Sequence, residues 1–313
     1  MKTVYFVIPC YNEQEVLPET SKRLLEKLES LVERCMISPD SRIVFVNDGS
    51  RDETYKIISQ LHEQDERFCG IKLSRNQGHQ NALLAGLMTV KDKCDAAISL
   101  DADLQDDIDV IDQFVEKFNE GCDVVYGVRS SRKTDTFFKR STALGFYKLM
   151  KFLGVEVVYN HADYRLMSKR ALEGLSEFKE VNLFLRGIVP LVGYKSATVE
   201  YERHERFAGE SKYPFKKMMA FAIDGITSFS VKPIRMVFSL GVIIFLCSIA
   251  VLIYSLIRWA FGQTVTGWTT LIISIWALGG IQLLSLGLIG EYIGKIYKEV
   301  KARPKFIIEE TLF

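Results

Sequence analysis

Residues 96–107 read AAISLDADLQDD, a short apolar run that ends in a cluster of acids. The run 96–100 has the length and the aliphatic character of a buried strand, and the polar residues begin directly after it. Asp101 and Asp103 are separated by one residue, so their carboxylates can share a hard divalent cation such as Mg²⁺ or Mn²⁺. Acid pairs are also common on ordinary protein surfaces, so the surrounding sequence decides how much this pair means.

Apolar runs and amphipathic stretches alternate through the first half of the chain. The spacing predicts strands at 3–8, 42–46, 70–73, 96–100 and 123–126, and helices at 13–33, 52–66, 80–91 and 107–119. This alternation predicts an α/β fold with a mostly parallel sheet covered on both faces, and residues 134–205 continue it with helix and some strand. Ligands bind beyond the C-terminal ends of the strands in such sheets. Polar residues follow the predicted strands at 9–13, 47–50, 74–78, 101–106 and 127–129.

Three of these polar clusters have the side chains of a nucleotide site. In the first, VIPCYNE at 7–13, Tyr11 can pack on a planar base and Glu13 can accept from a ribose hydroxyl or a base. In the second, VNDGS at 46–50, Asp48 is placed to bind a uracil or ribose edge. The third, SRNQGHQ at 74–80, is a polar loop that can close over a nucleotide. The alternative is that the first two clusters are plain turns, with Asn12 and Ser50 capping the following helices.

Several function classes lose support from composition and motifs. The 313 residues carry a net charge of +1, from 40 basic and 39 acidic residues, which argues against a nucleic-acid partner. No Gly-x-Gly-x-x-Gly or Walker-type loop occurs, so dinucleotide and ATP sites are disfavoured. The six cysteines have neither zinc-knuckle nor redox-pair spacing, as in reduced cytosolic proteins. The apolar run 4–8 is too short for a signal peptide and stops at Pro9, so we expect the catalytic part to stay in the cytoplasm.

The C-terminal third has a membrane signature. Residues 236–257 and 268–290 are runs of 22 and 23 residues without a charge, each long enough to cross a bilayer. Trp259 and Trp268 flank the connector 258–267. The nearby basic residues lie before the first run and after the second, and the connector holds only Arg258. This pattern predicts a multi-pass hairpin in the cell membrane with both termini cytoplasmic, rather than two buried core helices.

The chain is thereby divided into four parts. A catalytic domain is predicted at 1–213, and its polar end, 205–212, is expected to be a loop. An amphipathic helix within 214–235 is expected at the membrane surface, although an ordinary surface helix has the same pattern. The two transmembrane helices fill 236–292, and 293–313 is expected to be a cytoplasmic tail.

The motifs together resemble those of a known family. They are VIPCYNE, VNDGSRDET, LSRNQG, DADLQD, ADYRLMS and GESKY, then GGIQLLSLGLIGEYIGKIY at 279–297 and KARPKFII at 301–308. They span essentially the whole chain, and the last two are the most specific. The chain resembles family-two glycosyltransferases of the GT-A fold, in the polyprenyl-phosphate branch. That branch includes bactoprenol glucosyltransferases and, more distantly, dolichol-phosphate mannose synthases.

The resemblance implies roles for particular residues. It places Pro9, Tyr11, Glu13 and Asp48 at the nucleotide, and Asp101 and Asp103 at the metal and diphosphate. It makes Asp163 a base or sugar-orienting group, and Arg206 and Lys212 basic residues that contact phosphate. We expect further donor contacts from Ser50, Arg75, Ala102, Gln105 and Arg165. We expect acceptor-phosphate contacts from Arg129, Arg140 and Ser211, although the two arginines can instead pair with acids on a helix.

The expected reaction is an inverting, metal-dependent transfer of a hexose from a nucleotide-sugar to undecaprenyl phosphate at the cytoplasmic face. UDP-glucose is the first choice of donor, with UDP-N-acetylglucosamine and UDP-galactose as alternatives. Gly78-His79-Gln80 and Ala162-Asp163-Tyr164-Arg165 stand where relatives often read Gly-Lys-Glu and Gly-Asp-Phe-Arg, which bears on sugar identity.

Other readings and partners stay open from the sequence. A processive polysaccharide synthase usually carries Gln-x-x-Arg-Trp, whereas Arg258-Trp259 is preceded by Ser255. A non-catalytic nucleotide-sugar adaptor and a hydrolase are the remaining alternatives. A homo-oligomer, plausibly a tetramer, is expected, as are a downstream flippase and a second glycosyltransferase that together decorate an envelope polymer.

Overall fold

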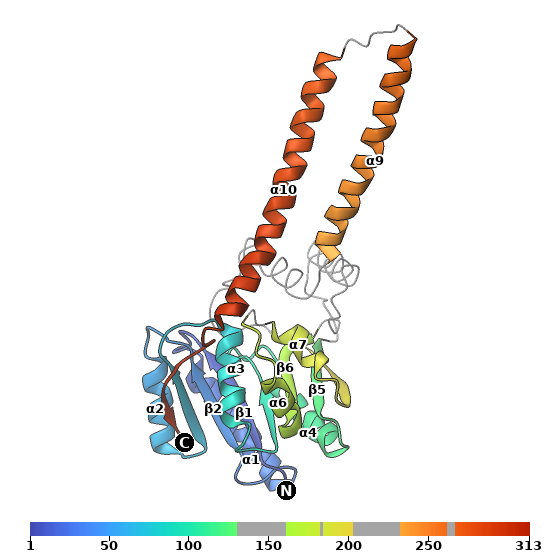
Figure 1. Cartoon of the computed structure of the whole chain (residues 1–313). Helices are drawn as coiled ribbons and strands as arrows, with labels where there is room; N and C mark the ends of the chain where they lie inside the picture. Colours follow the sequence, from blue (N-terminus) through green and yellow to red (C-terminus); the bar gives the residue numbers. More distant parts are fainter. Residues whose placement is uncertain (130–160, 182–183, 203–231, 262–266) are drawn as a thin grey trace.

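The computed structural model describes residues 1–313 apart from 130–160, 182–183, 203–231 and 262–266 (Figure 1). A sheet domain carries two long helices that run side by side away from it (Figure 1). The strands are β1 (Val4–Cys10), β2 (Arg42–Asn47), β3 (Phe68–Leu73), β4 (Ala96–Ser99), β5 (Val124–Arg129), β6 (His161–Ser168), β7 (Ser196–Tyr201) and β8 (Ile308–Leu312). The helices are α1 (Leu17–Glu33), α2 (Thr54–Gln64), α3 (His79–Val90), the short 3₁₀ turn η1 (Ile108–Val110), α4 (Ile111–Asn119), α6 (Lys169–Ser176), α7 (Leu185–Leu191), α9 (Lys232–Ala260) and α10 (Trp268–Lys301).

All the described strands join one eight-stranded sheet with the order β7-β5-β6-β4-β1-β2-β3-β8. Its centre, β4-β1-β2-β3, is parallel. β6 then runs antiparallel to both of its neighbours, β4 and β5, while β7 is parallel to β5. The expected parallel sheet is therefore confirmed at its centre, and the sheet is mixed toward its margins.

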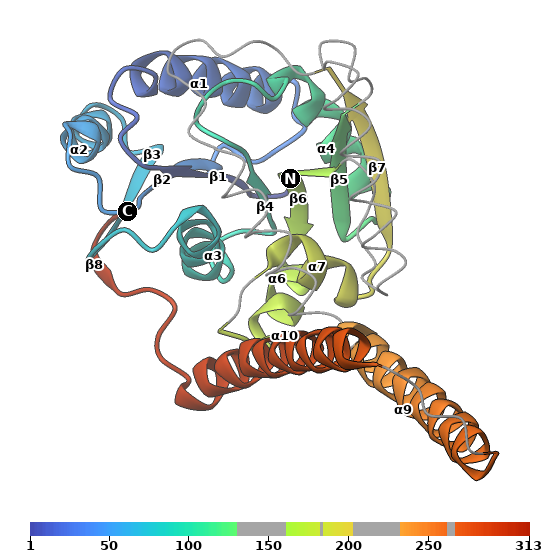
Figure 2. The same ribbon diagram turned by 90° about the horizontal axis from the view of Figure 1, so that it is seen from above.

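Helices cover both faces of the sheet because the central strands are apolar on both sides. Every residue of β1 is buried. Phe6 and Ile8 pack with α1, α2 and α4 in one core, and Val7 packs with α3, α6 and α7 in the other. Figure 2 shows the same division, with α1 and α4 on one side of the strands and α3, α6 and α7 on the other.

The predicted elements agree with the structure to within a few residues, and the differences lie at element ends. The first helix starts at Leu17 rather than at residue 13, because residues 11–16 form a turn that joins the strand edge to the helix. The helix predicted at 107–119 is split into η1 and α4. Residues 100–107 consequently form a loop that begins at the end of β4 and carries Asp101 and Asp103.

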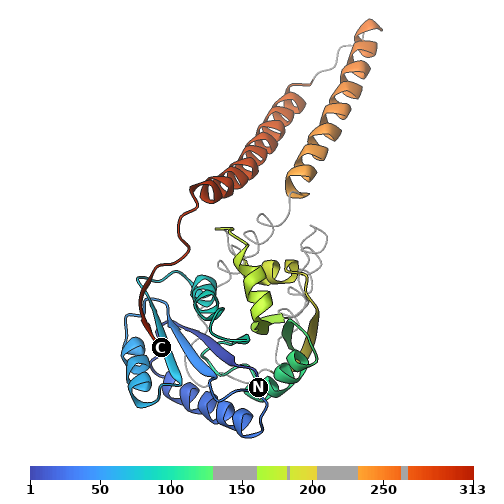
Figure 3. The same ribbon diagram turned by 60° about the horizontal axis from the view of Figure 1, so that its bottom comes forward.

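The C-terminal segment returns to the sheet, which the sequence did not predict. Residues 293–301 continue α10, and the chain then forms β8, which pairs antiparallel with β3. Lys72 of β3 bonds Glu309 of β8 at 2.7 Å. Figure 3 shows this last segment leaving α10 and reaching the sheet beside β3. The expected tail thus supplies an edge strand of the sheet domain.

The two charge-free runs fall inside α9 and α10. Parts of both runs, including the side chains at 251–252, 255–256 and 272–273, lie outside the described residues, as does the predicted surface helix at 214–231. Within the part of the chain that is described, no helix combines the length and the apolar character needed to cross a membrane.

Candidate active site

The polar residues that follow β1, β2 and β4 lie together, because these strands are parallel neighbours and end at the same edge. Pro9 is buried as the sixth residue of β1, and Tyr11 just beyond the strand is 36% exposed. Tyr11 is therefore exposed at this edge, and its predicted contact with a planar base stays a prediction. Asn12 takes a left-handed backbone conformation, with φ 54°, where the chain turns toward α1.

The loop after β1 is tied to the loop after β2 by side-chain to backbone hydrogen bonds. The Asn12 N–H donates to the Ser50 hydroxyl at 3.0 Å, and the Arg51 N–H donates to the Asn12 side-chain oxygen at 2.9 Å. The Glu13 N–H donates to the Thr54 hydroxyl at 2.9 Å. Ser50, which we predicted to lie at the donor, therefore fixes the relative position of the two loops that carry Tyr11 and Asp48.

Asp48 is buried and holds the loop 74–78 in place. Its two carboxylate oxygens accept from the backbone N–H groups of Gln77 at 2.6 Å and Gly78 at 2.9 Å. Burial raises the pKa of Asp48, and the two backbone hydrogen bonds partly offset the rise. Arg75, predicted to contact the donor, is exposed on this loop. Asp48 thus fixes the conformation of the loop that carries Arg75.

The acidic loop after β4 is anchored from behind by α1. The Thr20 hydroxyl donates to the carbonyl of Ala102 at 2.7 Å, and the Gln105 N–H donates to the Asp103 carboxylate at 3.2 Å. Leu104 between them has φ 55°, which is strained for a bulky residue and is typical of functional loops. Ala102 and Gln105 are buried, whereas the Asp101 side chain is 39% exposed.

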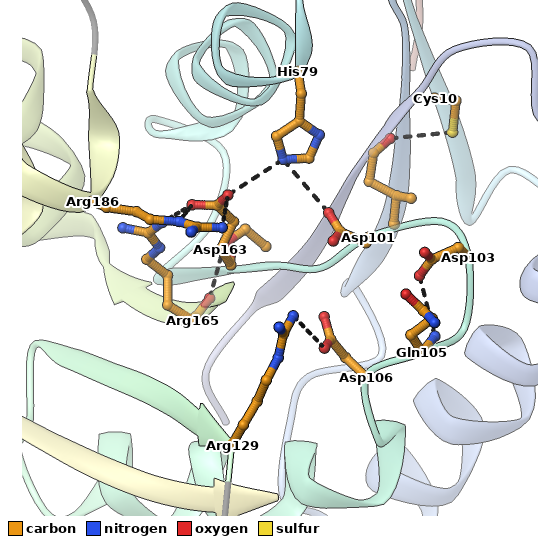
Figure 4. Close-up of polar contacts among 12 residues, drawn as sticks. Cys10, His79, Asp101, Asp103, Gln105, Asp106, Arg129, Asp163, Arg165 and Arg186 are labelled. Carbon is orange, nitrogen blue, oxygen red and sulfur yellow. Dashed lines mark hydrogen bonds and ion pairs between the residues drawn. The ribbon is translucent and has the colours of Figure 1, made fainter. Parts of the chain in front are cut away.

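Asp163 lies among three basic side chains (Figure 4). Arg165, two residues along β6 and so on the same face, bonds its carboxylate at 2.5 Å, and Arg186 of α7 bonds it at 3.1 and 3.3 Å. His79, the first residue of α3, is 3.6 Å from Asp163 and 3.5 Å from Asp101. Burial would raise the pKa of Asp163, but Arg186, His79 and Arg165 together lower it well below its usual range.

The charge of His79 follows from the same contacts. Burial disfavours its protonated form, but the hydrogen bond to Asp163 and the negative charge of Asp101 outweigh that effect and raise the pKa of His79 to about 9. At neutral pH the imidazolium therefore bridges the acidic loop and Asp163.

Arg129, predicted at the acceptor phosphate, lies at the end of β5 on the other side of the acidic loop. Its Nε donates to the Tyr201 hydroxyl at 3.3 Å, and its Nη2 is 4.0 Å from Asp106 (Figure 4). Arg140, Arg206, Ser211 and Lys212 lie outside the described residues, so their predicted roles stay predictions.

Four side chains of this site were absent from the predicted set: His79, Asp106, Arg186 and Tyr201. The motifs SRNQGHQ and DADLQD contain His79 and Asp106, so the pattern located them without assigning them a task. Arg186 stands in an apolar stretch with no accompanying motif, and only the packing of α7 against the sheet brings it to Asp163.

Asp101 and Asp103 provide suitable ligands for a divalent cation. Among the described residues, no group of three or more histidines, cysteines or acids could hold a metal ion. Mg²⁺ commonly binds one or two carboxylates and completes its shell with substrate phosphates and water. Two carboxylates on one loop, one of them accessible, match that donor set and leave positions for a diphosphate.

Comparison with known proteins shows the family to which the chain belongs. The family model for glycosyl transferase family 2 matches residues 5–176, and a model for the GtrB C-terminal hairpin matches 232–296. The uncharacterized glycosyltransferase YkoT of Bacillus subtilis is 56% identical over 98% of this chain and 91% of its own. The SfII prophage-derived bactoprenol glucosyl transferase of Shigella flexneri is 41% identical over 98% of both chains.

A solved structure, the mannosyltransferase PcManGT of Pyrobaculum calidifontis with GDP-Man and Mn²⁺, is 14% identical with a TM-score of 0.46 over 96% of this chain and 86% of its own. The family match covers more than half of the chain, and the two relatives cover nearly all of it. The acidic loop and the mixed sheet belong to a GT-A domain, and the chain is a glycosyltransferase of family 2 that ends in a GtrB-type hairpin region.

Proposed function

We propose that the protein transfers a hexose, glucose first, from its UDP-sugar to undecaprenyl phosphate at the cytoplasmic face of the membrane, with inversion at the anomeric carbon. The name of the Shigella relative, which is similar over 98% of both chains, supports the glucosyl donor and the bactoprenol acceptor. The expected product is a polyprenyl-phosphate-sugar used for glycosylation of the cell envelope.

The observation that carries this proposal is the cluster of three basic side chains around Asp163: Arg165 and Arg186 bond its carboxylate, and His79 lies 3.6 Å from it. The pKa of Asp163 lies well below the usual range because Arg186, His79 and Arg165 surround it, so Asp163 is a poor proton acceptor at neutral pH. A hydroxyl acceptor needs a base, whereas a phosphate monoester, with a second pKa of about 6, is already largely the dianion. A site in which Asp163 orients cations rather than accepts a proton therefore suits a phosphate nucleophile.

The chemical step forms a bond between a lipid-phosphate oxygen and the anomeric carbon and breaks the bond from that carbon to the diphosphate. UDP leaves with the electron pair, and no proton transfer is required. Asp101 and Asp103 would hold a divalent cation, which supplies electrostatic stabilisation of the leaving diphosphate when bound. Asp163 fixes Arg165 and Arg186, whose positive charges would stabilise the negative charge that develops on the leaving diphosphate.

The proposed lipid acceptor explains why the chain carries a membrane hairpin. Drawing a polyprenyl chain out of the bilayer costs about 0.8 kcal/mol for each CH₂ group, so the active site must come to the membrane. The match of 232–296 to a GtrB C-terminal hairpin and the charge-free runs 236–257 and 268–290 support two spans that hold the domain there.

The test is transfer of label into lipid. Detergent-purified full chain is incubated with undecaprenyl phosphate, Mg²⁺ or Mn²⁺, and radiolabelled UDP-glucose, UDP-N-acetylglucosamine or UDP-galactose in parallel. We expect one donor to label the organic phase. Asp103→Ala or EDTA should reduce the rate at least about a hundredfold. Asp92→Ala, an acid exposed on the surface at the end of α3, is the matched control and should retain wild-type activity.

The other outcomes separate the alternatives. Release of UDP without labelled lipid would indicate a hydrolase, and labelled material of high molecular weight would indicate a processive synthase. Labelling from another donor would keep the reaction type and change only the sugar.

A further inference from the structure

The described site contains a cluster of three polar side chains that have no part in the chemical step proposed above. It is formed by Asp106 of the acidic loop, Tyr201 and Arg129. Figure 4 shows Asp106 and Arg129 apart from the cluster around Asp163. The strand register brings two of the three side chains together, since Arg129 of β5 lies beside Tyr201 of the parallel strand β7.

The ring of Tyr201 is held in place by packing. It is only 3% exposed and packs edge-on against Tyr164, with ring centroids 5.3 Å apart and planes at 86°. Gly127 leaves room for it, since a Cβ there would lie 3.1 Å from the Tyr201 ring and 3.0 Å from the Tyr164 carbonyl oxygen. The hydroxyl of Tyr201 is therefore held at one position by packing on two sides.

From that position the hydroxyl forms hydrogen bonds with both Asp106 and Arg129. It donates to Asp106 Oδ1 at 2.6 Å and accepts from Arg129 Nε at 3.3 Å, which uses its donor together with an acceptor site. The guanidinium is thereby held on the edge that carries Nε. Arg129 Nη2 is 4.0 Å from the same carboxylate oxygen, so the charge of Asp106 also attracts the arginine.

This arrangement is a poor stabiliser of the fold. Asp106 is 6% exposed, and its second oxygen is buried with no hydrogen-bond partner among the described residues. Burial, together with the negative charge of Asp101, raises the pKa of Asp106 to about 6. A buried carboxyl that is half satisfied costs stability, so its presence calls for a role other than stability.

We propose that Asp106 and Tyr201 are positioning residues for the acceptor: they aim Arg129 at the phosphate of the polyprenyl phosphate. This inference rests on the proposed function for the identity of the acceptor. Arg129 touches the phosphate, and the other two act through it. Because Asp106 belongs to the loop of Asp101 and Asp103, the same pair also fixes the distance between the acceptor arginine and the donor's diphosphate site.

The test compares binding of the two substrates in the full chain. Isothermal titration measures the Kd of farnesyl phosphate, a short soluble acceptor, and the Kd of UDP with Mn²⁺. Tyr201→Phe keeps the ring and removes the hydroxyl. We expect this variant to raise the Kd of farnesyl phosphate roughly tenfold, the usual scale for a hydrogen bond to a charged group. The Kd of UDP should change less than twofold.

Two further variants make the result specific. Tyr164→Phe removes the hydroxyl of the other ring of the pair, which donates to the Asp107 carbonyl at 2.9 Å, and should leave the Kd of farnesyl phosphate unchanged. Arg129→Ala should raise the Kd of farnesyl phosphate. Adding Tyr201→Phe to Arg129→Ala should raise this Kd no further, because both changes act on one contact.

The proposal is overturned if Tyr201→Phe raises the Kd of both ligands alike or leaves the Kd of farnesyl phosphate unchanged. It is also overturned if the effects of Tyr201→Phe and Arg129→Ala on that Kd are fully additive. A wild-type protein that binds UDP but no farnesyl phosphate would overturn both this inference and the lipid acceptor. Selective binding through Arg129 without sugar transfer would support the inference and remove only the proposed reaction.

Discussion

The ring of His79 lies between two carboxylates, and its charge changes within the pH range of ordinary assays. Its pKa in the folded protein is about 9, against 6.5 for an unperturbed histidine. A raised histidine pKa stabilises the fold fully below the unfolded value, and this contribution is lost as the pH rises through the folded value. The relevant window is therefore pH 6.5 to about 9.

We expect the thermal midpoint of the metal-free wild-type protein to fall between pH 6.5 and pH 9 by more than that of His79→Gln. Differential scanning fluorimetry in EDTA at the two pH values measures the difference. Equal falls in the two proteins would show that the charge of His79 does not couple to folding.

Single residues also mark the limit of what sequence reasoning can find. Asp101 and Asp103 were predictable because a strand end and a characteristic spacing coincide. Arg186 was not, because its link to Asp163 crosses from α7 to β6 and depends on the packing of a short helix. The ionised state of Asp163 is equally invisible in the sequence, since it depends on three cations from three different elements.

At the scale of elements, the loops after β2 and β3 pack backbone against backbone. Gly49 has φ +61°, and a Cβ there would lie 2.5 Å from the backbone of both Arg75 and Asn76. The loop 74–78, which we predict to lie at the donor, can therefore approach the end of β2 only while residue 49 is glycine.

Gly49→Ala should displace that loop, lower stability by more than about 1 kcal/mol and raise the KM for the sugar donor several-fold. Gly121→Ala is the matched control, because Gly121 also has positive φ, at +87°, yet has no atom within 4 Å of the added Cβ. We expect it to cost some stability and to leave the donor KM unchanged. Equal donor KM values for the two variants, measured by steady-state transfer, would contradict the role of the close approach.

The central sheet was predictable from its alternating apolar runs, and its margins were not. β6 begins beyond residues that carry no clear period, and β8 is a single short strand with acids at two of its five positions. Both are strands because they pair with other strands, β6 with β4 and β5, and β8 with β3. This pairing is a tertiary effect that local sequence does not encode.

At the scale of the whole molecule, the long helix and the catalytic domain are joined at more than one point. Glu299 near the end of α10 accepts from the Val181 N–H at 2.8 Å, and Lys305 donates to the Phe178 carbonyl at 3.3 Å. β8 then adds to β3, with Leu312 packed close to Gly70. The hairpin region is thus connected to the sheet domain both beside α6 and α7 and at the β3 edge of the sheet.

A chain that lacks residues 307–313 should leave β3 as an unpaired edge. We expect a lower thermal midpoint and self-association, seen by scanning fluorimetry and size-exclusion chromatography in detergent. Glu309→Ala is the control, because it removes only the exposed ion pair to Lys72 and should change stability by no more than about 1 kcal/mol. A truncated chain as stable and as monodisperse as this control would show that β8 is dispensable.

The pairing of β8 with β3 also has a consequence for biosynthesis. Glu309 follows its partner Lys72 by 237 residues, and the whole helical hairpin is translated between them. The β1-β2-β3 part of the sheet therefore leaves the ribosome with the edge of β3 unpaired, and this edge is covered only after the hairpin has been made. An incompletely translated chain consequently differs from a finished one by an exposed β edge, whatever the state of the rest of its core.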